Sequence, residues 1–200
     1  MSAGEKKNQG NRSDLTSIKE MIDQGSSDLD VAEHDFAKWV QYRKSFTAYR
    51  ALKFPIAPRS EKSCVVVYWG VTGTGKSKAA HDVGCKFVSF QNSFLLGLFD
   101  NEEHNRVCFD DFDPSTVPFT LLLNLLDRYP MRVNIKNGSI EWSPKSIIIT
   151  SNVAPYEWYP EIPMHRYDAL RRRIDYEVEF DVTGPKKDLF DFDGIMELIN

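Results

Sequence analysis

Two hydrophobic patterns divide the chain near residue 58. Over residues 13–53, apolar side chains recur at intervals of three and four, which predicts short amphipathic helices. Gly25 is expected to end the first helix, and Asp30 to cap the second with Glu33 as its capping-box partner. Helices this short are marginal alone, so we expect them to pack on each other, on the next domain or on a second copy of the chain. The apolar stripe of the last helix consists of Phe36, Trp39, Val40, Phe46, Tyr49 and Leu52.

From residue 63 the pattern changes to short apolar runs rich in β-branched and aromatic residues, which predict buried strands. Helices are expected from a glycine-rich turn to about Gly84, and over 118–129. Strands that alternate with helices predict an α/β fold with a parallel sheet covered on both faces. The expected strands are 65–69, 87–90, 107–109, 146–150 and 175–180.

One segment departs from this alternation. Residues 132–142 form two short alternating runs around Asn137-Gly138, a dipeptide that supplies the positive φ angles of a two-residue turn. We therefore expect an antiparallel β-hairpin between the third and fourth strands, with Lys136 at its tip. Lys136 is a candidate contact to a nucleic-acid backbone, and a solubilising lysine on an edge strand is the ordinary alternative.

Composition narrows the class of protein. The 200 residues carry a formal net charge of −4, with 42% hydrophobic and 27% charged residues, which is a soluble globular balance. Any nucleic-acid binding therefore needs a local basic patch. Three cysteines without a CxxC pair favour buried thiols over a disulfide or zinc framework. With no signal peptide and no apolar run of about 20 residues, we expect a cytosolic or nuclear protein without membrane contact.

Residues 70–77 match the phosphate-binding loop pattern GxxxxGK[ST], directly after a predicted buried strand and at the start of a predicted helix. The glycines let backbone N–H groups converge on the β-phosphate of a nucleoside triphosphate. Lys76 neutralises charge on the β- and γ-phosphates, and the Ser77 hydroxyl ligates Mg²⁺. The nucleotide-binding residues predicted from this pattern are Gly70, Thr72, Gly73, Thr74, Gly75, Lys76, Ser77 and Lys78.

Polar residues also follow the third and fourth predicted strands. We expect Asp110, one strand away from the loop, to hold Mg²⁺ and Asp111 to orient or deprotonate the attacking water. Asn152 follows the fourth strand, at the sheet edge where open parallel sheets bind ligands, and is expected to hold that water or sense the γ-phosphate. One arginine of 171–173 is a candidate to reach the triphosphate of a neighbouring subunit, although spacing alone favours a solvated helix face.

The order and spacing of these motifs resemble the helicase half of replication-initiator proteins (Rep) of small circular single-stranded DNA viruses, closest to the circovirus type. The segments that carry the resemblance are GVTGTGKSK (70–78), VCFDDF (107–112), LLDRYPMRVNIKNGSI (125–140), SIIITSN (146–152), APYEWYP (154–160) and ALRRRI (169–174). The resemblance implies a superfamily 3 helicase with a P-loop NTPase fold of the AAA+ type. It also implies ATP and Mg²⁺ as cofactors, single-stranded DNA as partner, a ring that is usually a hexamer, and the host nucleus as location.

The resemblance further implies a role for each matched residue. Lys76 and Ser77 fall in Walker A, and the Asp110–Asp111 pair in Walker B. Asn152 corresponds to the motif C sensor. The hairpin with Lys136 and Asn137 corresponds to the DNA-contacting B-prime hairpin, and Arg172, or else Arg173, to the arginine finger.

The expected organisation is a flexible terminus (1–12), a helical oligomerisation domain (13–58), an ATPase/helicase domain (59–183) and a C-terminal tail (184–200). The endonuclease motifs of the family are not present in this sequence, so we expect no nicking or joining of DNA. Two alternatives stay open at this point: a P-loop phosphotransferase acting on a small molecule, and a non-catalytic, ATP-dependent assembly module for replication.

Overall fold

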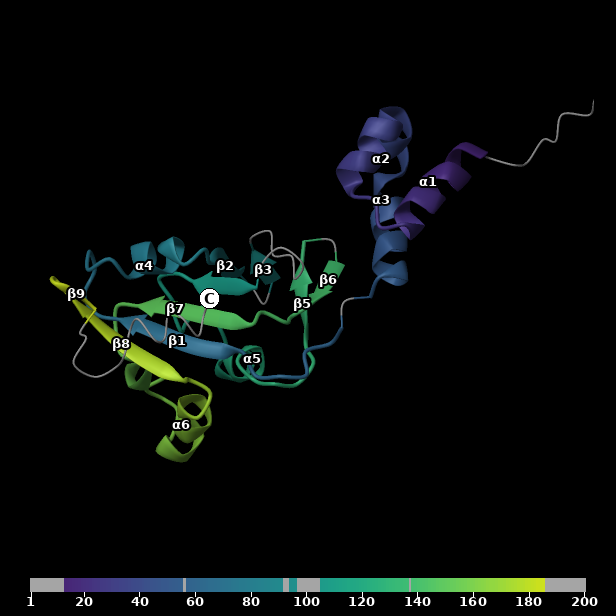
Figure 1. Ribbon diagram of the computed structural model, residues 1–200. Helices are drawn as coiled ribbons and strands as arrows, with labels where there is room; N and C mark the ends of the chain where they lie inside the picture. The colour runs from purple at the N-terminus through teal and green to yellow at the C-terminus, as the bar shows by residue number, and fades with distance from the viewer. Residues whose placement is uncertain (1–12, 56, 92–93, 97–104, 137, 186–200) are drawn as a thin grey trace, which may run out of the picture. The chain divides into compact units, whose positions relative to one another are not determined.

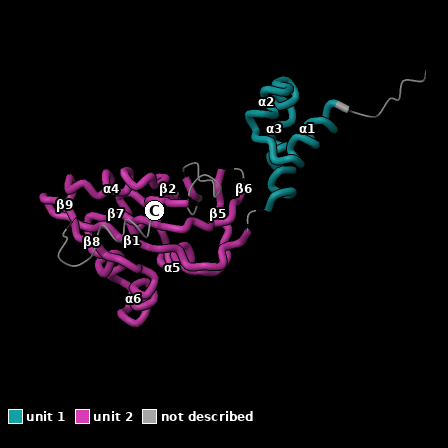
Figure 2. The backbone as a smooth tube through the Cα atoms, in the orientation of Figure 1, with its two compact units in different colours: residues 1–56 teal, residues 57–200 magenta. Residues whose placement is uncertain are grey.

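The computed structural model describes residues 13–55, 57–91, 94–96, 105–136 and 138–185. The chain divides into two compact units, Met1–Ile56 and Ala57–Asn200 (Figure 2). Each unit has its own cluster of buried hydrophobic residues.

Unit 1 consists of helices α1 (Ser13–Asp23), α2 (Asp28–His34) and α3 (Phe36–Lys53). Ile18, Ile22 and Val31 are its fully buried hydrophobic residues, and partly buried side chains of α3 pack against them. The chain leaves α1 through Gly25, whose φ of 87° favours glycine, as expected for a helix stop.

The predicted cap of α2 was wrong. Ser27 is the N-cap: its hydroxyl accepts the Asp30 N–H (3.1 Å), and the Asp30 carboxylate accepts the Ser27 N–H (2.6 Å). Asp30 is therefore the partner of the capping box and not the cap, so Glu33 has no part in it. Since Gly25 already turns the chain, the first hydroxyl–carboxylate pair at the right spacing begins the helix.

The described strands of unit 2 form one nine-stranded sheet in the order β6-β5-β3-β2-β4-β7-β1-β8-β9 (Figure 1). The pairings β2·β4, β4·β7, β7·β1 and β1·β8 are parallel. The mixed α/β fold with a mostly parallel central sheet is thus confirmed. The strands are β1 (Cys64–Trp69), β2 (Lys86–Gln91), β3 (Phe94–Leu96), β4 (Arg106–Phe109), β5 (Arg132–Ile135), β6 (Gly138–Glu141), β7 (Ser146–Ser151), β8 (Tyr176–Asp181) and β9 (Gly184–Pro185).

Helices cover both faces of this sheet, as expected. Side chains alternate between the faces along β1, so Val66 packs in one cluster with Ala80 of α4 (Lys76–Asp82). Val65 packs in the other cluster, with Leu122 of α5 (Phe119–Leu125) and Leu170 of α6 (Met164–Arg171). The short 3-10 helix η1 (Pro155–Glu157) leads from β7 towards α6. Among the described helices, none is long and apolar enough to cross a membrane.

The hairpin is present, but its turn differs from the prediction by one residue. Strands β5 and β6 are antiparallel, and Ile135 pairs with Gly138. Gly138 is therefore the first residue of β6 and not part of the turn. The pairing of buried Val133 with Ile140 sets this register, because a slip would turn Val133 away from the core. Lys136 lies in the turn, whereas Asn137 lies outside the described residues.

The strand order changes one expectation about the site. Asp110 was expected one strand away from the glycine-rich loop, but β7 lies between β1, which leads into the loop, and β4, which leads into Asp110. The end of β7 therefore lies between the loop and the carboxylates.

Candidate nucleotide-binding site

The loop between β1 and α4 takes a path that only glycine permits at its first residue. Gly70 has a φ of 138°, and a Cβ there would lie 2.1 Å from the Phe180 carbonyl oxygen of β8. The Gly70 N–H donates to the Ser151 carbonyl of β7 (3.2 Å). At Gly73 (φ 81°) and Gly75 (φ 92°), a Cβ would meet no atom within 4 Å. The loop is thus held between β7 and β8 at its start and stays open on its outer side.

Lys76, the first residue of α4, is folded into this loop. Its side chain is only 5% exposed, and its ammonium donates to the carbonyls of Gly70 (2.7 Å) and Val71 (2.9 Å). A third, longer bond of 3.3 Å reaches Oδ1 of Asn152. Burial lowers the pKa of the Lys76 ammonium, and the carboxylates of Asp111 and Asp110 act in the opposite direction. The Lys76 ammonium is therefore bound within the loop by carbonyl oxygens, and among the described residues it forms no direct ion pair.

Ser77 and Asp110 form the second part of the site. The Ser77 hydroxyl donates to Oδ1 of Asp110 (2.6 Å), and the Thr150 hydroxyl donates to the same oxygen (2.7 Å). Thr150 also accepts the backbone N–H of Asp111 (2.9 Å). Asp111 has a φ of 45°, which is uncommon for a residue with a side chain, and this bond helps to hold it there.

Thr150 and Ser151 are site residues that sequence reasoning missed. Both are buried at the end of β7. Ser151 Oγ accepts the N–H groups of Val153 (3.2 Å) and of the Trp158 indole (2.9 Å), and so fixes the turn that follows Asn152. The available signal was the run of two hydroxyl residues and an amide after three isoleucines, since polar residues at a buried strand end need partners.

The other residues of the predicted loop have lesser roles in this geometry. The Thr74 hydroxyl donates to the Val71 carbonyl (2.9 Å) and so braces the loop, whereas Thr72 is exposed. The Lys78 ammonium pairs with Asp82 one turn along α4 (2.7 Å) and is exposed.

Three predicted residues do not join this site within one copy. Lys136 is exposed in the β5–β6 turn. Arg172 and Arg173 follow α6 and precede β8, so they lie at the amino edge of the parallel strands, opposite the loop. Arg173 pairs with Asp127 and donates to the Ala169 carbonyl (2.5 Å), whereas no ion pair involves Arg172 among the described residues.

Few protein oxygens are available for a metal ion. Among the described residues there is no group of three or more His, Cys, Asp or Glu side chains suited to a metal. The Ser77 hydroxyl and the Asp110 carboxylate are hard oxygen donors of the kind that Mg²⁺ prefers, and Mg²⁺ usually keeps water and phosphate oxygens as its other ligands.

The fold and this site together define a mixed α/β protein whose polar residues gather at the carboxyl ends of parallel strands, where such sheets bind ligands. Comparison with known proteins identifies relatives of similar sequence. The chain is 37% identical over 169 residues to the replication-associated protein of Canary circovirus, which is 84% of this chain and 56% of that protein. It is 38% identical over 170 residues to that of Pigeon circovirus (83% and 51%) and 34% identical over 176 residues to that of Porcine circovirus 1 (86% and 55%).

The chain is therefore a homologue of circovirus replication-associated proteins, which confirms the resemblance seen in its motifs. It spans about half the length of the curated relatives it matches. No protein-family model matches it.

Proposed function

We propose that this chain is the ATP-hydrolysing motor of a viral replication initiator, a P-loop NTPase of the AAA+ type that moves on single-stranded DNA. One observation carries the proposal: Lys76 in its loop, the Ser77–Asp110 pair and Asn152 converge at the carboxyl ends of three parallel strands. The homology to replication-associated proteins supports a role in DNA replication.

The residues present fit a magnesium-bound triphosphate. Gly73 and Gly75 leave the outer side of the loop open, and the Lys76 ammonium already lies within it. Ser77 and Asp110 place two oxygen donors 2.6 Å apart at its base. When bound, Mg²⁺ would neutralise charge on the β- and γ-phosphates. The lowered pKa of Lys76 reflects a desolvated amine, and a phosphate beside it would favour its charged form.

Each side chain near the loop has a different role in the proposed ATP hydrolysis. Lys76 exchanges its carbonyl partners for phosphate oxygens and stabilises the charge that develops there. Asp111 is exposed beside the half-buried Asp110, so its carboxylate is placed to orient or deprotonate a water. Asn152 holds the same water through its side-chain amide, after releasing Lys76. Thr150 positions both acids.

Assembly and DNA binding complete the proposal. Arg172 and Arg173 lie at the amino edge of the sheet, out of reach of the loop in their own copy. They therefore contact the nucleotide of a neighbouring copy, with Arg172 as the arginine finger. The copies form a ring, a hexamer in the form we propose, with unit 1 as the oligomerisation domain. The exposed Lys136 at the hairpin turn contacts the DNA backbone.

The test is the Lys76→Ala variant, assayed for magnesium-dependent nucleotide binding and for phosphate release. We expect hydrolysis to fall about 100- to 1,000-fold, the loss typical of removing one preorganised charge. Lys145→Ala, which removes an exposed lysine before β7, is the matched control and should retain full activity. Failure of the unaltered chain to bind Mg²⁺–ATP would refute the proposal. Hydrolysis that DNA does not stimulate would favour a phosphotransferase, and nucleotide binding without hydrolysis would favour the non-catalytic assembly module.

The DNA contact has a separate test. Lys136→Ala should weaken single-stranded DNA binding and reduce the slope of log affinity against log salt by about 1, with basal hydrolysis intact. Lys86→Ala on β2 is the control for loss of a lysine elsewhere on the same sheet. An unchanged DNA affinity at matched salt would remove Lys136 from the interface.

A further inference from the structure

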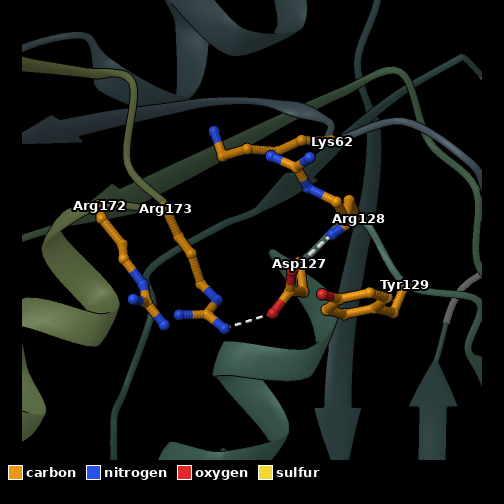
Figure 3. Close-up of a pocket in the computed structure, with 6 residues that line it drawn as sticks. All are labelled: Lys62, Asp127, Arg128, Tyr129, Arg172 and Arg173. Atoms are coloured by element: carbon orange, nitrogen blue, oxygen red, sulfur yellow. Dashed lines mark hydrogen bonds and ion pairs between the residues drawn. The ribbon is translucent and has the colours of Figure 1, made fainter.

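A pocket of about 380 Å³ lies at the amino edge of the sheet of unit 2 (Figure 3). Three segments far apart in the sequence form it: the residue run before β1, the turn after α5 and the turn between α6 and β8. Its lining residues are Lys62, Asp127, Arg128, Tyr129, Arg172 and Arg173. A strand of six residues such as β1 spans roughly 20 Å, so the pocket lies far from the phosphate loop at the other end of that strand.

The pocket holds more positive charge than its own carboxylates neutralise. Lys62 pairs with Asp175, and Arg173 pairs with Asp127. No ion pair involves Arg128 or Arg172 in the part of the chain that the structure describes. Figure 3 shows the Arg172 side chain running alongside Arg173, and the Arg128 side chain extending towards Lys62. Two unneutralised guanidinium groups thus line one pocket and are exposed to an incoming ligand.

The turn that carries Arg128 is rigidly held from below. The Arg59 side chain is only 6% exposed and donates to the carbonyls of Leu125 (2.7 Å), Asn124 (2.9 Å) and Tyr129 (2.8 Å). On the other side of the turn, Asp127 is fixed by its ion pair with Arg173. Arg128 therefore projects from a preorganised turn, which lowers the entropy lost when it binds a ligand.

Guanidinium groups bind phosphate oxygens by paired hydrogen bonds, and a pocket with two of them suits a polyphosphate. The phosphates of a nucleotide in the loop of the same copy are out of reach, since loop and pocket lie at opposite ends of β1. The phosphates of a nucleotide bound to another copy can approach the pocket, because the length of β1 does not separate them from it.

We propose that Arg128 and Arg172 together bind the terminal phosphates of a nucleotide held in the phosphate loop of a second copy of this chain. Arg128 is then a further residue of the nucleotide site, beyond the single arginine that the proposed function requires. Arg59 and Asp127 are positioning residues for it. The inference rests on the proposed function, because it takes the loop of the second copy as the source of the phosphates.

The test is complementation between two inactive variants. Arg128→Ala alone should lower kcat for ATP about 100-fold, with nucleotide binding by the loop retained. Lys76→Ala alone is inactive because its loop is impaired. Co-assembly of differently tagged Arg128→Ala and Lys76→Ala chains, verified by native mass spectrometry, should restore hydrolysis. In such an assembly the intact loop of one chain meets the intact arginines of the other. Arg172→Ala should be rescued by Lys76→Ala in the same way.

Arg171→Ala is the matched control, because Arg171 is next in sequence but faces Glu177 (3.9 Å) and does not line the pocket. It should hydrolyse ATP at the rate of the unaltered chain. Arg128→Ala with unaltered kcat, or with a loss that Lys76→Ala does not rescue, would overturn the inference while the proposed function stands. Weaker DNA binding with unaltered kcat would instead make the pocket a DNA contact, which also overturns it. If the unaltered chain does not hydrolyse ATP, the proposed function itself fails.

Discussion

The two units differ most in how much of each element they bury. All six residues of β7 in unit 2 are buried, whereas none of the 18 residues of α3 in unit 1 is. Unit 2 packs both faces of its sheet, and unit 1 has a core of Ile18, Ile22 and Val31. Because burial of apolar surface is the main driving force of folding, unit 2 has the means to stand alone and unit 1 is marginal.

The apolar residues of unit 1 that remain exposed have a common explanation. Phe36 and Val40 are 66% and 60% exposed and lie one helical turn apart on α3. Leu29 and Leu52 are exposed as well. The difference between the units therefore suggests that unit 1 completes its packing with other copies, which fits its proposed role in oligomerisation.

The largest expected effect is on the core of unit 2. Trp142 is fully buried, contacts Phe109, and donates its indole N–H to the Leu125 carbonyl (3.0 Å). Trp142→Ala should lower the free energy of unfolding of unit 2 by about 3–5 kcal/mol, measured by chemical denaturation. Trp39→Ala in the half-buried position of unit 1 is the comparison and should cost clearly less. Equal losses would mean that the units do not differ in packing.

The second effect concerns self-association. Val40→Asp places a charge on the exposed apolar face of α3 and should weaken assembly about tenfold or more, which corresponds to about 1.4 kcal/mol. Analytical ultracentrifugation measures it. Gln41→Asp adds the same charge on another face of the helix and serves as control. If both variants assemble like the unaltered chain, this face is not the interface.

A smaller effect is expected at the start of α2. Ser27→Ala removes the cap that accepts the Asp30 N–H and should cost about 1 kcal/mol of local stability. Hydrogen exchange of the amides of 28–53 should accelerate, with exchange in the sheet of unit 2 unchanged. Ser45→Ala, an exposed mid-helix position, should not accelerate exchange. Acceleration in both units would show that they unfold together.

The smallest effect is the response to acid. A hydrogen bond from Lys19, then one from Tyr49, lowers the pKa of Asp23 to about 2. The stability that Asp23 gives unit 1 is therefore complete above its ordinary pKa of 3.8 and is lost as the pH falls towards about 2. In unit 2, burial raises the pKa of Glu177, so its ionisation is unfavourable and acid relieves it. Hydrogen exchange between pH 5 and pH 2 should show unit 1 weakening first, and Asp23→Asn should flatten that response.

Much of the fold was readable from local signals. The five parallel strands were predicted because four are short, mainly apolar runs and β8 alternates apolar with polar residues, and the loop because its glycines and lysine lie together in sequence. Strand β3 has only three residues, and α6 buries Leu170 alone among eight residues, so neither leaves a hydrophobic period to detect. Helix α5 ends at Leu125, four residues before its predicted end. There the Arg59 guanidinium donates hydrogen bonds to the last carbonyls of the helix, those of Asn124 and Leu125.

The parts of the site that sequence did not reveal depend on strand order. Thr150 holds both Asp110 and Asp111 only because β7 lies between β1 and β4. Arg59 and Arg128 are 69 positions apart in sequence, and Arg59 supports the turn that carries Arg128 by donating to the Tyr129 carbonyl. No spacing rule within one segment expresses such relations.

Gly70 brings the phosphate loop into direct contact with β8. Its backbone lies so close to the Phe180 carbonyl that even a methyl group would collide with it, and Phe180 is near the end of β8. The other end of that strand is Tyr176, three residues after Arg173. Strand β8 therefore contacts the phosphate loop at one end and continues into the arginine-bearing turn at the other, so a single strand joins the two edges of the sheet.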